Sequence, residues 1–307
     1  MRKIISIIFV CATAFLTAGV AGAEQNVFNQ SGIVGEVYPN LASGALTFAK
    51  TGQLPEGVLL KAENVEVKLE DVNKAIEAQP VQIREELRRS AFFVLEQEAA
   101  GRLLLQSAKK TAENPGNKTD EQLLNDYINR LTEKVTITDQ EIQTFYRENE
   151  GVFCGTPLEK VKNQIGPYVL DEKKQRLVAE HIRTLGKRID IIVSAPWVEG
   201  QVVLAKNNPL DKIRGNGKTT LAIFSAASCC GPDKMLPVFD ALKSQYTGSL
   251  NILYLEAKKE QILAARHNVY SIPTQLIFDK TGKETFRHTG FLSKDEIAKK
   301  LAEMGVK

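Results

Sequence analysis

Residues 219–239, TTLAIFSAASCCGPDKMLPVF, join a short apolar run, two adjacent cysteines and the start of a helical pattern. The continuous apolar run from Thr219 to Phe224 predicts a strand that is buried on both faces. Apolar residues three or four apart over 234–243 predict a helix with one buried face. Cys229 and Cys230 therefore fall between a strand and a helix, where unpaired N–H groups and the helix dipole favour a thiolate.

From Lys218 onward, the chain predicts the order strand, helix, strand, helix, strand, strand, helix. Two further motifs accompany it, Ser271-Ile272-Pro273-Thr274 and Phe278-Asp279-Lys280-Thr281-Gly282-Lys283. Together with Gly231-Pro232-Asp233-Lys234-Met235, they resemble the thioredoxin family over the last third of the chain. The resemblance implies an α/β thioredoxin-like domain over residues 218–307 and an activity in thiol–disulfide exchange.

The family's Cys-Gly-Pro-Cys motif appears here as Cys230-Gly231-Pro232-Asp233. This register implies that Cys230 is the catalytic nucleophile, with Cys229 in support. A second register stays open, because the family's helix proline lies eight residues after the first cysteine and Pro237 lies eight after Cys229. Neither register supplies a Cys-x-x-Cys pair, so the second thiol that releases a mixed disulfide has no counterpart at the usual spacing.

Asp233 has two interpretations. Its carboxylate either opposes formation of the nearby thiolate and so raises the pKa of that thiol, or simply suits the first turn of the helix. The family's buried acid in the first strand corresponds to Phe224 or a neighbour, which removes a group that assists the resolving thiol. Ile272 and Pro273 occupy the position of the family's cis-proline, and the resemblance implies that they bind an extended substrate.

The N-terminus has a basic start, an apolar core and the small residues Ala21-Gly22-Ala23. This pattern predicts a signal peptide over residues 1–23, hence export to an oxidising compartment, the periplasm of a Gram-negative host. Residues 24–45 are polar and predict a flexible lead-in. No apolar span follows, and a net charge of +3 on 307 residues does not favour nucleic acid as a partner.

Residues 46–193 contain short strands followed by a helical pattern, with capping signals at Thr119 and Thr138. This segment resembles the N-terminal domain of SurA-type periplasmic chaperones, most specifically at 135–142 and 145–149. Relatives often carry a parvulin insert where this chain has only residues 150–156, so peptidyl-prolyl isomerase activity is not implied. Pro196 and Pro209, with glycines at 215 and 217, predict a linker over residues 194–217.

We therefore expect a mainly α SurA-like chaperone domain joined to an α/β thioredoxin-like domain. The expected partners are unfolded or cysteine-containing exported proteins and a thiol–disulfide redox partner, with no membrane span after signal removal. No metal or other cofactor is expected, since the three histidines are scattered. The alternative is a non-catalytic periplasmic chaperone or peptide-binding protein with a degenerate motif, CCGPD.

Overall fold

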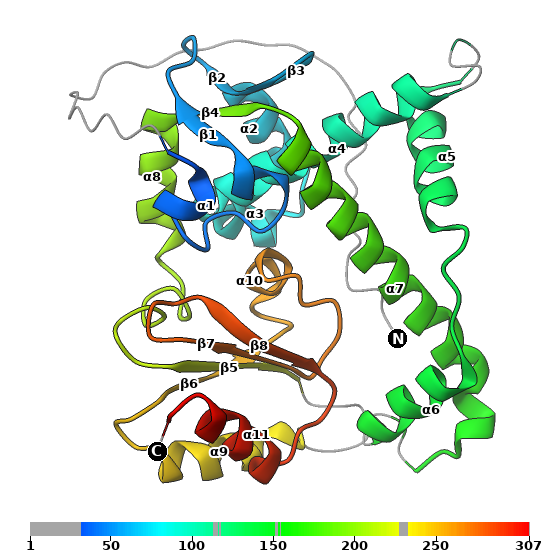
Figure 1. Cartoon of the computed structure of the whole chain (residues 1–307), viewed down its shortest axis with the longest axis vertical. Coiled ribbons are helices and arrows are strands. Elements are labelled where there is room, and N and C mark those ends of the chain that lie inside the picture. The colour runs from blue at the N-terminus through cyan, green and yellow to red at the C-terminus, as the bar shows by residue number, and fades with distance from the viewer. Residues whose placement is uncertain are drawn as a thin grey trace. The chain divides into compact units, whose positions relative to one another are not determined.

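The computed structural model describes residues 32–112, 116, 118–150, 153, 155–226 and 233–306 (Figure 1). The predicted signal peptide, residues 24–31 and the stretch that holds Cys229 and Cys230 lie outside the described residues. The chain divides into two compact units. Unit 1 comprises Met1–Arg130 and His181–Leu204, and unit 2 comprises Leu131–Glu180 and Ala205–Lys307.

Unit 1 contains a four-stranded sheet of order β1-β4-β2-β3, in which only the β1–β4 pair is parallel. Helix α4 packs beside this sheet because its apolar side chains, among them Phe92, Leu95 and Leu103, are fully buried. The elements are α1 (Val34–Val37), η1 (Ala45–Phe48), β1 (Lys50–Gly52), β2 (Val58–Ala62), β3 (Val65–Lys68), α2 (Leu69–Glu77), α3 (Val81–Arg89), α4 (Ala91–Thr111), α5 (Asp120–Thr132), β4 (Ile191–Ser194) and α8 (Ala195–Ala205).

The described part of the expected flexible lead-in, residues 32–45, is instead packed against unit 1. Val34 and Leu41 are buried, and Ile33 forms an isolated bridge with Lys50. The carboxylate of Glu96, only 2% exposed, accepts hydrogen bonds from the N–H groups of Ser43 and Gly44. Sequence polarity missed this because the groups that hold the segment lie about fifty residues away.

The expected linker, residues 194–217, contains helix α8. Pro196, which predicts a linker, stands in the first turn of α8, where proline removes no helical hydrogen bond. Trp197 on this helix stacks on Phe92, with the ring centroids 6.3 Å apart. The packing of this aromatic pair within unit 1 explains why the segment is ordered rather than extended.

Two helices, α6 (Asp139–Glu148) and α7 (Leu158–Arg188), contribute to unit 2 as far as Glu180. Residues 131–180 were expected to belong with the helical domain, so the unit boundaries differ from the expected domain boundaries. The predicted capping box of Thr138 and Glu141 is present at the start of α6. Ile142, Phe153, Val161 and Ile165 form a small apolar core between the two helices.

The thioredoxin-like part of unit 2 is a four-stranded sheet of order β6-β5-β7-β8, with β5 parallel to β6 and antiparallel to β7. Figure 1 shows α9 and α11 on one face of this sheet and α10 on the other. The elements are β5 (Thr220–Ser225), α9 (Met235–Gln245), β6 (Asn251–Glu256), α10 (Gln261–Arg266), β7 (Thr274–Phe278), β8 (Glu284–Thr289) and α11 (Lys294–Glu303).

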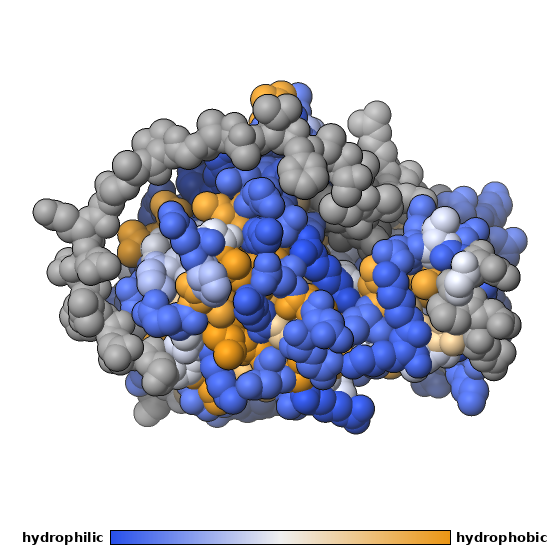
Figure 2. All heavy atoms as spheres, turned by 90° about the horizontal axis from the view of Figure 1, so that it is seen from above, coloured by the Kyte–Doolittle hydropathy of each residue, from blue (hydrophilic) through white to orange (hydrophobic). Residues whose placement is uncertain are grey.

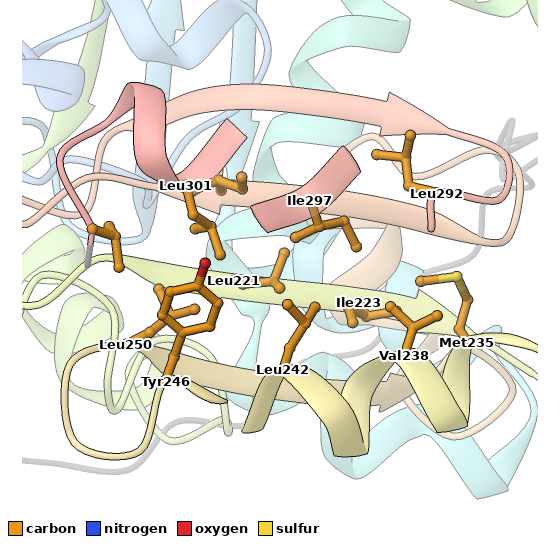
Figure 3. Close-up of a cluster of buried hydrophobic side chains, with 12 residues drawn as sticks. Leu221, Ile223, Met235, Val238, Leu242, Tyr246, Leu250, Leu292, Ile297 and Leu301 are labelled. Atoms are coloured by element: carbon orange, nitrogen blue, oxygen red, sulfur yellow. The ribbon is translucent and has the colours of Figure 1, made fainter. Parts of the chain in front are cut away.

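Strand β5 is buried along its whole length, as its continuous apolar run predicts. Leu221 and Ile223 face the core formed with α9 and α11, whereas Ala222 and Phe224 face the core on the side of α10. Figure 3 shows the first core, to which β5, α9 and α11 contribute Leu221, Ile223, Met235, Val238, Leu242, Ile297 and Leu301.

Within the described residues, no helix combines the length and the apolar character needed to cross a membrane.

Candidate functional site

The expected nucleophiles lie in a short chain segment between two fixed elements. Strand β5 ends at Ser225 and helix α9 begins at Met235, so Cys229 and Cys230 connect a core strand to a core helix. The two cysteines themselves lie outside the described residues. The site is therefore built from the groups around that segment, which are Asp233, the loop at Pro273 and their neighbours.

Asp233 lies two residues before the first residue of α9 and is 6% exposed. Its Oδ1 accepts a hydrogen bond of 2.7 Å from the N–H of Met235, the first residue of the helix. Its Oδ2 accepts a hydrogen bond of 2.5 Å from the hydroxyl of Tyr254 on β6. The Asp233 carboxylate therefore supplies an acceptor for the first N–H of α9 that the N-cap residue, Lys234, does not supply. The effect of Asp233 on a thiol stays a prediction.

Tyr254 is a residue that sequence reasoning missed. The pKa of Tyr254 is raised above its usual value, first because the side chain is partly buried. The hydrogen bond to Asp233 and the negative charge of Asp233 raise this pKa further. Its ring packs edge-on against Phe239 of α9, with centroids 5.9 Å apart. The sequence signals only that Tyr254 lies in a half-buried strand. An ordinary strand tyrosine has the same pattern, so this signal does not single Tyr254 out.

The peptide bond between Ile272 and Pro273 is cis, as the thioredoxin resemblance predicts. Strand β7 starts at the next residue, Thr274, which pairs with Phe224 near the end of β5. Since β5 and β7 are antiparallel, the cis-proline lies at the sheet edge where the chain leaves β5 towards Cys229. The Pro273 carbonyl accepts a 2.8 Å hydrogen bond from the N–H of Gly290, which follows β8.

Ser271, directly before this dipeptide, joins it to helix α7 within unit 2. The hydroxyl of Tyr168 donates a 2.8 Å hydrogen bond to Ser271 Oγ. Ser271 in turn donates a 2.7 Å hydrogen bond to Oε2 of Glu172, and Glu172 also pairs with Arg176. The sequence contained no signal for this contact, because about one hundred residues separate its partners and no local pattern relates them.

A cleft of about 580 Å³ opens beside this contact, between α6, α7 and β8. Its lining carries both signs of charge, including Glu141, Lys173, Arg176 and Arg287. Lys173 pairs with Glu141, and Arg287 pairs with Glu284, so these cations are already neutralised. The described residues contain no group of three or more histidine, cysteine, aspartate or glutamate side chains placed to hold a metal ion.

The fold and the site together define a thioredoxin-like α/β domain with a strand–cysteine–helix junction and a cis-proline at one sheet edge. The model of the thioredoxin-like domain family matches residues 207–305. Residues of this chain are 38% identical over 76 positions to thioredoxin of Staphylococcus aureus, for example strains Mu50 and MW2. That match covers 24% of this chain and 72% of the relative.

The chain therefore belongs to the thioredoxin family through its C-terminal part. A thioredoxin-like domain suggests a thiol–disulfide redox function. Among solved structures, one described as a malarial protein is 20% identical and covers 28% of this chain and 96% of its own, with a TM-score of 0.25. That score supports no conclusion. The residues that the family model matches do not include 46–193, so the resemblance to SurA-type chaperones stays a prediction.

Proposed function

We propose that this protein is an exported thiol–disulfide oxidoreductase of the periplasm that acts on non-native or cysteine-containing client proteins. Cys230 is the nucleophile, Cys229 supports it, and Ile272 and Pro273 bind the extended client chain. One observation carries the proposal. In a thioredoxin-family domain, Thr274, which directly follows Pro273, pairs with Phe224 near the end of β5, the strand that precedes the two adjacent cysteines in the chain.

The chemistry needs only sulfur exchange. The Cys230 thiolate attacks one sulfur of a client disulfide, a new S–S bond forms, and the other client sulfur leaves as a thiolate. If a second client thiolate then attacks the mixed disulfide, Cys230 is regenerated and the client has been isomerised without net oxidation. If Cys229 attacks instead, the client leaves reduced and the protein keeps both oxidising equivalents in a vicinal disulfide, which a redox partner with two thiols must reduce.

Thiol counting on the purified protein tests the proposal. Mild oxidation and re-reduction should remove and restore reactive thiols at the cysteine pair, and Cys230→Ser should abolish the effect. A Cys229→Ser protein that keeps Cys230 should trap client chains as mixed disulfides resistant to denaturant and sensitive to dithiothreitol. Cysteines that never oxidise, together with an empty trap, would exclude the enzymatic function.

A second function, holding non-native chains without redox turnover, is favoured by exposed apolar side chains in unit 1. Val81 and Val203 are 69% and 72% exposed, and Leu69 and Leu204 are also exposed. Figure 2 shows hydrophobic residues exposed among hydrophilic ones on one face of the molecule. Exposed apolar side chains that gather into a contiguous patch are a kind of surface that binds other chains.

The full-length protein should slow the aggregation of a chemically denatured test protein, even when Cys229 and Cys230 are both changed to serine. Val81→Asp and Val203→Asp should weaken this effect, and the exposed-site substitution Lys299→Ala in unit 2 should not. Equal aggregation with and without the protein would exclude this second function.

A further inference from the structure

Helix α6 and residues 158–180 of α7, here called the arm, are packed on the loops that flank the cis-proline within unit 2. The arm has its own apolar core. The ring of Phe145 on α6 packs against the ring of Tyr168 on α7, with the ring centroids 5.3 Å apart. Lys173 ties the helices together with hydrogen bonds of 2.7 Å to Glu141 and to the carbonyl of Thr136. The arm is therefore a preformed element that can dock as one piece.

The first docking contact occupies the residue before the cis dipeptide. Tyr168 and Glu172 engage the two hydrogen-bonding functions of the Ser271 hydroxyl, one as donor and the other as acceptor. Glu172 is only 9% exposed, so its carboxylate depends on Ser271 and Arg176 for the interactions that replace water. A hydrogen bond to a buried carboxylate is among the stronger ones in proteins, which favours the docked arm.

The second docking contact lies on the other side of Pro273. Gly290, whose N–H binds the Pro273 carbonyl, packs directly against Glu148 at the end of α6. A Cβ at position 290 would lie 3.0 Å from the Cβ of Glu148, a tight approach, and the φ of +114° at this position also favours glycine. The next residue, Phe291, donates its backbone N–H to the Glu148 carbonyl at 3.1 Å, as it could to an extended peptide.

We propose that the arm is the resident occupant of the cis-proline face and that it must leave before a polypeptide client reaches Ile272 and Pro273. This inference rests on the proposed thiol–disulfide function for its consequence, and on the contacts at Ser271 and Phe291 for its geometry. The arm uses groups on both sides of the cis dipeptide, so arm and client compete. Small disulfides, which need no backbone pairing, are not excluded.

The test compares the intact protein with the Tyr168→Phe/Glu172→Ala double variant, which removes both contacts to Ser271 from the arm side. Asp171→Ala is the matched control, because it also removes one negative charge from α7 but contacts Gln175 instead. Hydrogen exchange is measured over residues 268–274 and 288–293. Thiol reactivity is measured with 2,2′-dithiodipyridine and with a 15-residue peptide whose cysteine carries a 2-nitro-5-thiobenzoate disulfide.

The double variant should speed hydrogen exchange over both segments. It should also raise the rate of reaction with the peptide, relative to the rate with dithiodipyridine, by about tenfold. This is the change in the fraction of molecules with the arm undocked that is expected when roughly 1.4 kcal/mol of docking free energy is lost. The control should leave both unchanged. Unchanged exchange, or an unchanged rate ratio, would overturn the inference. If no protein reacts with dithiodipyridine, the proposed function fails, and the exchange data alone then decide whether the arm covers this face.

Discussion

The hydrogen bond between Asp233 and Tyr254 connects the start of α9 to β6, and removing it should weaken this part of unit 2. The perturbation is a double-mutant cycle of Asp233→Ala and Tyr254→Phe. Asp233→Ala also removes the acceptor for the Met235 N–H, whereas Tyr254→Phe removes only the hydroxyl. The cycle therefore separates the side-chain pair from the helix cap.

The expected magnitudes follow from the two hydrogen bonds. Loss of a cap costs about 0.5–2 kcal/mol, and a hydrogen bond to a charged group contributes about 1.5–3 kcal/mol. Asp233 is buried but Tyr254 is only partly so, which favours the lower end for the pair. We expect about 2–4 kcal/mol for Asp233→Ala and a coupling energy of about 1.5 kcal/mol between the two positions.

Native-state hydrogen exchange of α9 and β6 measures this locally. The one tryptophan of the chain, Trp197, lies in unit 1, so its fluorescence reports the unfolding of unit 1 and serves as an internal control. Asp233→Ala should also lower the pKa of Tyr254, because two of the causes that raise it are removed, and phenolate absorbance should appear at lower pH. A coupling energy below about 0.5 kcal/mol would refute the assigned contact.

Three further predictions also concern unit 2. Burial, together with the charges of nearby arginines, holds the pKa of His267 well below 6.5, so the neutral imidazole stabilises the fold above pH 6.5 and this stability is lost as the pH falls below 6.5. Denaturation curves should show that the intact protein loses about 1 kcal/mol more of its unfolding free energy than His267→Leu does between pH 7.5 and 5.5. Parallel pH profiles of the two proteins would contradict this. Leu301→Ala should cost about 2–5 kcal/mol because Leu301 of α11 is fully buried in the core that α11 forms with β5 and α9. Lys299→Ala, by contrast, should stay within about 0.5 kcal/mol in the same melts. Asp233→Cys should give faster insulin reduction by dithiothreitol than Asp233→Ser does, and equal rates would count against Cys230 as the nucleophile.

Much of the thioredoxin-like domain could be predicted because its signals are local. The apolar run at Thr274–Phe278 coincides with β7, and Ser293 with Glu296 forms the capping box at the start of α11. The turn after β7 contains Gly282 with φ of +87°, which a hairpin turn at this point predicts. In each case, a few neighbouring residues determine the backbone without help from distant ones.

Helix α8 and the packing of residues 32–45 could not be predicted in this way. Both depend on distant partners, namely Phe92 for Trp197 and Glu96 for Ser43 and Gly44. The residues of the candidate site likewise fall into those set by a local motif and those set by distant partners. The cis-proline follows from a short motif, whereas Tyr254 and the contacts of Ser271 arise only when strands and helices from separate parts of unit 2 pack together.

The position of Asp233 explains how a thioredoxin fold persists without Cys-x-x-Cys. In the Cys230 register, Asp233 stands where the resolving cysteine would be, and it satisfies the N–H of Met235 at the start of α9. The helix start is thus stabilised whether or not the position takes part in chemistry, so the fold alone does not require redox turnover. Both carboxylate oxygens of Asp233 accept hydrogen bonds. Since this residue is an aspartate, no thiol stands at this position to release a mixed disulfide. The proposed chemistry must then rely on Cys229 or on a second client cysteine, and the latter makes isomerisation, rather than net reduction, the reaction that this sequence change favours.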